Sequence, residues 1–404
     1  MILESMKRNH VTDNKLWDLV DRANDLTRGD YDSWDNNAPV LVPLLERILV
    51  LAREREEWQV YFYDMAKLFW YVRRSTVNNI SLAFKVSEMF HHDFEQRVGE
   101  NVGAFAKEWR VDMAAQILSF YCEYPQINDG KIARMLEIFR ECEARYGGDW
   151  NFGDYTAVMD LALFNRDREL AEEAAGKLKK TMYADHCYCY VCTYARPMIG
   201  YHILRGESEE AAEIVSRVCK KAIPAKYRWC FDMCQQANEE DMKDITLMHC
   251  LAQRACDQFA GFFEDWQALY RQPKQGEVDD TFNVFFHALA GDWSRQEERL
   301  LLAEQDDLGR REREDVPLDS LYWSLCWYGY FQMLDERGQG NVNLALGEQA
   351  KEGRRAWTCR EAAEYFGHQA DLLGEQMNRS RARFDYEGMK TCYEECLKYR
   401  KTGD

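Results

Sequence analysis

The stretch of sequence that decides the fold is a short polar turn between two helical patterns, Ile203-Leu204-Arg205-Gly206-Glu207-Ser208-Glu209-Glu210-Ala211-Ala212. Apolar residues recur at helical spacing on both sides of it, and Gly206 is of the residue type that most readily ends a helix in a left-handed conformation. The same turn occurs 40 residues earlier, where Arg166 takes the place of Gly206 and Ala171 matches Ala211. The turn therefore predicts a helix pair that is repeated along the chain.

Further helix pairs are predicted on both sides of this one. Apolar stripes at helical spacing predict helices over 58–69, 80–90, 105–121, 132–142, 155–164, 170–178, 195–204 and 211–218. Gly291 lies 85 residues after Gly206, close to two units of about 40 to 44 residues. No segment alternates apolar and polar residues over a useful strand length. We therefore expect a stack of antiparallel helix pairs, because one pair alone cannot bury its apolar face.

The charge of the chain limits its partners. Its 404 residues include 70 acidic and 52 Lys and Arg side chains, which gives a formal net charge of −18. Nucleic acid and anionic membrane surfaces both require a cationic face, so we expect neither as the main partner. Hydrophobic residues make up 46% of the chain, enough for a substantial core, and 7 prolines leave room for long helices.

The cysteines and the apolar segments indicate a cytoplasmic protein. Many of the 14 cysteines fall inside helical patterns, among them Cys122, Cys142 and Cys326, which is typical of buried thiols in a reducing compartment. Residues 1–8 contain no apolar core of a secretion signal. The strongest apolar segment, 39–52, is too short to span a bilayer.

The turn at 203–212 resembles that of the tetratricopeptide (TPR) repeat. The resemblance is carried by Gly206 at the end of the first helix and by Ala211, a small residue five positions later, while Pro224 falls close to the terminal proline of the family. Ala195 and His202 stand where the family usually has aromatic residues. The spacing between the repeats also exceeds the family's period of about 34 residues, so armadillo-like units or an unrelated multi-helix domain are the alternatives.

The resemblance implies an all-α fold, a right-handed α-solenoid of stacked antiparallel helix pairs (a TPR-like superhelix). The corresponding organisation is a partly helical N-terminal segment over 1–40, a repeat array over 41–378 and a C-terminal capping helix over 379–404.

Four cysteines have the spacing of a zinc site. Cys189 and Cys192 are three positions apart, a spacing at which two thiolates share one tetrahedral zinc, and Cys230 and Cys234 supply a second pair at the start of the next helical segment. Equivalent helix starts in successive units are neighbours, which brings the two pairs together. The alternative is that these cysteines are unpaired thiols packed in a seam.

A second group of metal-ligand types is His91-His92-Asp93 with Glu95. Imidazole and carboxylate suit divalent cations, and this group would serve a metal-dependent hydrolase. Because it lies at the end of a predicted helix, histidines that meet the negative end of the helix dipole are the alternative explanation.

The most aromatic helix is predicted around 319–333. Trp323, Trp327 and Tyr330 form one stripe, whereas Leu321 and Leu325 form another that better suits a dry helix seam. We expect the aromatic stripe to line the ligand groove, where Trp and Tyr provide contact area and a hydrogen bond. Alternatively, both stripes are core.

These observations predict a non-catalytic scaffold or adaptor that binds a peptide or protein segment on a concave face and needs no cofactor. A regulatory peptide sensor, whose superhelix changes on ligand binding, is the first alternative, and a metal-dependent hydrolase is the second. The sequence contains no GxSxG, Walker-type or dinucleotide-binding motif.

Overall fold

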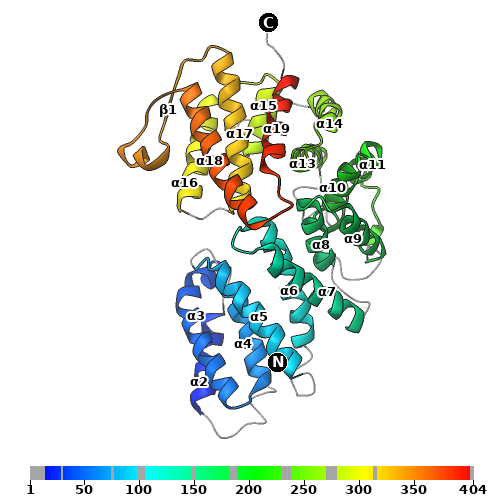
Figure 1. Ribbon diagram of the computed structural model, residues 1–404, viewed down its shortest axis with the longest axis vertical. Helices are drawn as coiled ribbons and strands as arrows, with labels where there is room; N and C mark the ends of the chain where they lie inside the picture. The colour runs from blue at the N-terminus through cyan, green and yellow to red at the C-terminus, as the bar shows by residue number, and fades with distance from the viewer. Residues whose placement is uncertain are drawn as a thin grey trace. The chain divides into compact units, whose positions relative to one another are not determined.

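The structure is a computed structural model of the chain (Figure 1). It describes residues 14–28, 31–73, 77–97, 105–146, 152–181, 189–229, 231, 234, 238–269, 280–312 and 316–400. The chain divides into two compact units, which are described separately. Unit 1 comprises Met1–Phe120 and Ile132–Tyr146, and unit 2 comprises Tyr121–Lys131 and Gly147–Asp404.

The regular secondary structure described in unit 1 is entirely helical. It contains α2 (Asn14–Leu26), α3 (Tyr31–Glu54), α4 (Trp58–Tyr71), α5 (Ile80–Gln96) and most of α6 (Phe105–Glu123) and α7 (Asp129–Tyr146). The stripe that predicted α4 faces the core, since Phe62, Met65 and Phe69 are fully buried. The start of α5 is fixed by Asn79, whose side chain accepts a hydrogen bond from the backbone N–H of Leu82.

The first part of unit 2 is a series of helix pairs. These are α8 (Phe152–Phe164) with α9 (Arg168–Thr181), α10 (Arg196–Arg205) with α11 (Ser208–Cys219), and α13 (Glu239–Ala252) with α14 (Cys256–Leu269). A π-helical turn, η1 (Val191–Ala195), leads into α10, and a 3-10 turn, η2 (Ala225–Tyr227), follows α11. Helix α10 contacts both α8 and α13, so each pair packs on the next.

The predicted turn at Gly206 is confirmed. Gly206 adopts a φ of +80°, its N–H bonds the carbonyl of Ile203, and α11 begins two residues later. Ala211 is fully buried, as a close approach of the two helices requires.

The last part of unit 2 is built around one long central helix. Its helices are α15 (Thr281–Leu289), α16 (Gln296–Glu312), α17 (Pro317–Glu336), α18 (Cys359–Ser380) and α19 (Tyr386–Cys396), followed by a 3-10 turn, η4 (Leu397–Tyr399). Helix α17 contacts α15, α16, α18 and α19, and Figure 1 shows it among them. It is therefore covered on several sides.

A small hairpin departs from the purely helical prediction. Strands β1 (Asn341–Leu344) and β2 (Arg355–Thr358) pair antiparallel with Val342 opposite Trp357, and a 3-10 turn, η3 (Gly347–Glu352), joins them. The indole N–H of Trp357 donates to the Leu344 carbonyl at 3.1 Å. Each strand has four residues, too few for alternation to be recognised from sequence.

Arg381, near the end of unit 2, contacts the C-terminal end of α6. Arg381, which follows α18, is buried, and its guanidinium donates to the carbonyl of Tyr121 and, at 2.6 Å, to that of Tyr124. These carbonyls lie at the end of α6, where intrahelical donors run out. Arg381 therefore caps a helix that lies 260 residues earlier in the chain.

The all-α prediction is confirmed, apart from the hairpin. The expected segment boundaries do not coincide with helix ends: the one at residue 40 falls inside α3 and the one at 378 inside the last turn of α18. None of the described helices is both long enough and apolar enough to cross a membrane.

Candidate functional site

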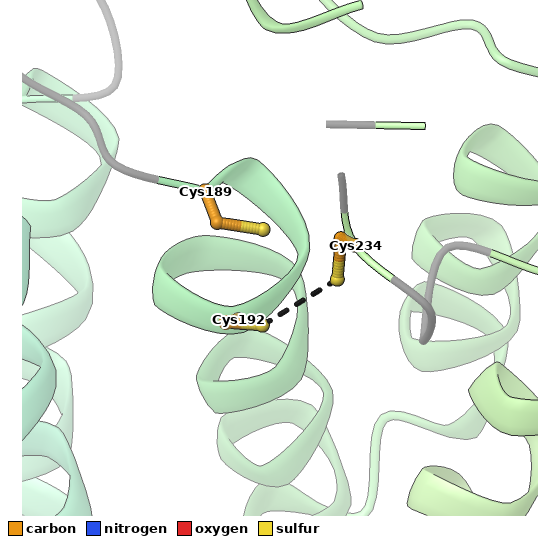
Figure 2. A group of neighbouring side chains, drawn as sticks. All are labelled: Cys189, Cys192 and Cys234. Carbon is orange, nitrogen blue, oxygen red and sulfur yellow. Dashed lines mark hydrogen bonds between the residues drawn. The ribbon is translucent and has the colours of Figure 1, made fainter. Parts of the chain in front are cut away.

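Three of the four cysteines predicted as zinc ligands converge in unit 2. The sulfurs of Cys189, Cys192 and Cys234 all lie within 4.8 Å of one another, and those of Cys192 and Cys234 are 3.6 Å apart. Figure 2 shows the three side chains directed toward a common space, two from the start of the helix that η1 opens and one from the segment before α13. The fourth predicted ligand, Cys230, lies outside the described residues.

The π-helical turn that carries Cys192 has a local cause in the sequence. Pro197 has no N–H to offer the carbonyl four residues earlier, and its ring crowds that carbonyl. The carbonyl in question belongs to Thr193, and it accepts a hydrogen bond from the Thr156 hydroxyl of α8 at 2.9 Å instead. The N–H of Thr193 in turn donates to the carbonyl of Cys189 at 2.9 Å. Both the carbonyl and the N–H of Thr193 are thus hydrogen-bonded, which stabilises the widened turn beside the thiols.

The thiols of this group hydrogen-bond one another, which shifts their pKa values. A hydrogen bond from Cys192, together with its backbone N–H, lowers the pKa of Cys189 to about 5, and the same hydrogen bond raises the pKa of Cys192. The lowered pKa favours the thiolate form of Cys189, which is the form that binds a metal.

The spacing of the sulfurs fits zinc. A Zn–S bond is about 2.3 Å long, so two sulfurs on one tetrahedral zinc ion are about 3.8 Å apart. The 3.6 Å separation of Cys192 and Cys234 is close to that value. All three side chains are half-buried, which leaves a path for the ion to enter.

A second group of three thiols was missed by the sequence analysis. Cys256, the first residue of α14, lies within 4.8 Å of Cys392 and Cys396 of α19. The two α19 cysteines are four residues apart and share a helix face, which was a detectable signal. Their partner lies 136 residues earlier than Cys392, so no local spacing pointed to it.

The residues His91, His92, Asp93 and Glu95 do not form a common site. His91 is buried, and neither ring nitrogen has a hydrogen-bond partner among the described residues. His92 bonds Gln96 at 2.9 Å, Asp93 accepts from the Tyr61 hydroxyl at 2.5 Å, and Glu95 accepts from Arg110 at 2.6 Å. His92, Asp93 and Glu95 thus each contact a different residue, His91 contacts none of them by a hydrogen bond, and the geometry gives no support to a hydrolase centre there.

The predicted aromatic groove is corrected by the structure. Trp327 and Tyr330 are both 0% exposed, and so are Leu321 and Leu325; Trp323 is half-buried. The placement of Trp327 and Tyr330 on an exposed groove was wrong because α17 is packed by neighbouring helices on several sides, which makes both residues part of the core.

A hollow lies elsewhere in unit 2, among α11, α13 and α14. Its volume is about 320 Å³. Its lining combines the buried Val215 and Thr246 and the half-buried Phe262 with the exposed charged residues Lys220 and Glu239. None of these residues belongs to a motif, so the hollow could not be predicted from the sequence.

Comparison with known proteins leaves the TPR resemblance a prediction. No protein-family model matches the chain, and no curated protein matches it either.

Proposed function

We propose that this protein is a non-catalytic scaffold that binds a peptide or protein segment in the hollow among α11, α13 and α14. The observation that carries the proposal is the hollow itself, which lies between successive helix pairs. Its volume is at the lower end of the range of ligand pockets, about 300–1,000 Å³, and suits one or two side chains rather than a large cofactor.

The lining of the hollow favours binding over chemistry. Among the described residues its lining contains no histidine, and burial raises the pKa of the Cys219 thiol, which therefore stays protonated at neutral pH. The ammonium group of Lys243 lies 3.5 Å from the Glu239 carboxylate, so part of the charge is already paired. An apolar side chain flanked by polar groups complements such a lining.

The helix pairs around the hollow also suggest a repeat architecture for this part of unit 2. We propose that α8–α9, α10–α11 and α13–α14 are consecutive units of a right-handed TPR-like superhelix. Support comes from the glycine turn between α10 and α11 and from the packing of each pair on the next. Such arrays bind ligands on the concave surface that their stacked units create, and the hollow lies where two of the proposed units meet.

A pocket-filling variant tests the binding function. Ala212 lines the hollow at an exposed position on α11, so Ala212→Trp places a large ring there without disturbing the core. Proteins recovered from a native lysate are identified for the wild type and the variant, and Ala133→Trp on α7, also at an exposed helical position, is the control. We expect a stoichiometric partner of the wild type and the control to be lost with Ala212→Trp. Equal recovery by all three proteins would contradict this site.

The convergence of three thiols favours a second function, zinc binding. We propose that Cys189, Cys192 and Cys234 hold one zinc ion, with Cys230 as the fourth ligand that the sequence predicts. Zinc would join the start of α10 to the segment before α13. Because Glu239 lies at the start of α13 and lines the hollow, the ion would also fix one side of that hollow.

Metal analysis tests the zinc site directly. Protein washed free of loosely bound metal is expected to contain about one equivalent of zinc, since a structural site contributes its binding energy to folding. The double variant Cys189→Ser, Cys192→Ser is expected to lose the metal and to melt at a lower temperature. Cys219→Ser, a half-buried cysteine outside the group, is the control. A metal-free wild type whose melting temperature is unaffected by added zinc or chelator would rule the site out.

A further inference from the structure

The second thiol group differs from the first in the approach of its sulfurs. The sulfurs of Cys256 and Cys392 are 2.6 Å apart, whereas those of Cys192 and Cys234 are 3.6 Å apart. Two sulfurs on one tetrahedral zinc ion need about 3.8 Å, so the Cys256–Cys392 pair is too close for a shared ion. Its distance lies nearer to the covalent sulfur–sulfur bond of about 2.05 Å.

The three thiols also differ in access to solvent. Cys256 is partly exposed, while Cys392 and Cys396 are buried. Cys256 is therefore the thiol that a dissolved oxidant reaches first, and Cys392 is a buried thiol in contact with it.

Its surroundings make Cys256 the nucleophile of the group. Hydrogen bonding with Cys392 and Cys396 lowers the pKa of Cys256, and the same contacts with Cys256 raise the pKa of both α19 thiols. Cys256 is also the first residue of α14, where the positive end of the helix dipole favours an anion. A thiolate with a neutral thiol in contact is the arrangement in which a sulfenic acid is captured as a disulfide.

We propose that Cys256 and Cys392 form a reversible disulfide on exposure to a hydroperoxide, with Cys396 as the thiol that supports the Cys256 anion. This inference does not depend on the proposed binding function or on zinc at the other thiol group.

The reaction balances in two steps. The Cys256 thiolate attacks the outer peroxide oxygen, so that an S–O bond forms, the O–O bond breaks and an alcohol (water, for hydrogen peroxide) leaves. The Cys392 sulfur then attacks the Cys256 sulfenic acid, so that the S–S bond forms, the S–O bond breaks and water leaves. In sum two thiols lose two electrons and two protons, and the hydroperoxide is reduced. A thiol reductant reverses the change by exchange.

The disulfide would connect two elements that are distant in sequence. It links the start of α14 to α19, across 136 residues, and α19 also packs on α13, α17 and α18. A bond that closes so long a loop restricts the unfolded chain strongly, so oxidation is expected to raise the melting temperature.

Mass mapping of the full-length protein tests the proposal. Reduced, chelator-treated protein receives one equivalent of hydrogen peroxide, the remaining thiols are alkylated, and the linked peptides are identified. We expect a Cys256–Cys392 link with the loss of two hydrogens, its removal by dithiothreitol, and a melting temperature roughly 5–10 °C higher in the oxidised form. Alkylation of Cys256 in the reduced protein is expected to be at least about tenfold faster than that of Cys219, whose pKa is raised.

Variants separate the roles of the two cysteines. Cys392→Ser is expected to abolish the link and to leave a Cys256 sulfenic acid that dimedone captures, whereas Cys219→Ser is expected to form the link as the wild type does. Wild-type protein in which Cys256 and Cys392 both remain alkylatable after the peroxide is consumed would overturn the proposal. So would a metal ion in the untreated protein that Cys256→Ser removes. The first of these results is measured on the wild-type protein alone, and neither uses Cys392→Ser, so both stand even where that variant fails to fold.

Discussion

Trp327 gives the most direct test of how unit 2 is held together. Its indole is fully buried, donates to the Asp306 carboxylate at 2.7 Å, and lies within 5.4–6.2 Å, between ring centroids, of Tyr330, Phe331 and Phe366. Trp327→Ala removes all of these contacts and leaves a cavity among rings that cannot fully close it. Substitutions of this kind cost about 3–5 kcal/mol.

A second variant divides that cost. Trp327→Phe keeps most of the ring packing but removes the indole N–H, whose hydrogen bond to a charged group is worth about 1.5–3 kcal/mol. Asp306 retains the Thr281 hydroxyl as a donor at 2.5 Å, so its carboxylate is not left without a partner, and we expect a loss near the lower end of this range. Trp323→Ala, four residues earlier on α17 and only half-buried, is expected to cost less than Trp327→Ala.

Urea unfolding followed by far-UV circular dichroism measures these differences. A domain is usually stable by about 5–15 kcal/mol, so the loss of 3–5 kcal/mol moves the midpoint of Trp327→Ala well below that of the wild type. An unfolding free energy within about 1 kcal/mol of the wild type would refute the burial of Trp327 and return that residue to a possible ligand surface. If Trp323→Ala lowered the unfolding free energy as much as Trp327→Ala does, the burial of the side chain on α17 would not explain the loss of stability.

Two other predictions concern helix packing and pH. Gly374→Ala on α18 is expected to destabilise the protein by about 1–3 kcal/mol, because a Cβ there would overlap the Tyr386 ring. Gly176→Ala on α9 is expected to stabilise it by about 0.5–1 kcal/mol, because a Cβ there meets nothing within 4 Å and alanine favours the helix. The melting temperatures of the two variants should shift in opposite directions, and shifts of the same sign would contradict the packing. Burial raises the pKa of Asp244 to about 8, against the donated hydrogen bond from Trp266, so the folded state holds this proton more tightly than the unfolded chain and wild-type stability falls as pH rises from about 4 to about 8. Asp244→Asn should match the wild type near pH 4 and exceed it increasingly toward pH 8, by up to about 1.4 kcal/mol per pH unit, in unfolding titrations at each pH; a constant difference between the two proteins would contradict a buried neutral carboxyl.

Much of the helical layout was predictable because local rules decide it. The apolar stripe of α4 and the glycine at 206 each act within a few residues, and both gave the observed structure. The hairpin at 341–358 was not predictable in this way, because its four-residue strands depend on Trp357 packing and not on a repeating pattern.

The sites show the same division. Cys189 and Cys192 were found because three positions along a chain are a recognisable spacing, and Cys234 followed from the repeat. Cys256 and Cys392 meet only after α19 has packed on α14, so the sequence offered no spacing to read. The error over Trp327 has the same origin: an aromatic stripe shows that a helix face is apolar, and only the neighbouring helices decide whether that face is covered.

The cap that Arg381 places on α6 has a consequence for the order in which the protein is made. Residues 121–124 leave the ribosome long before residue 381 is synthesised. During that time the last carbonyls of α6 cannot bond the guanidinium of Arg381. In an ideal array of repeats each unit contacts only its neighbours, so folding can begin in any unit and spread to the next. Unit 2 instead reaches its final state only when nearly all of it has emerged, and contacts of such long sequence separation slow folding. A nascent chain released before residue 381 would therefore lack more than its last helix. The carbonyls of Tyr121 and Tyr124 at the end of α6 would have no guanidinium to bond, so the truncation would also affect a helix in the first third of the chain.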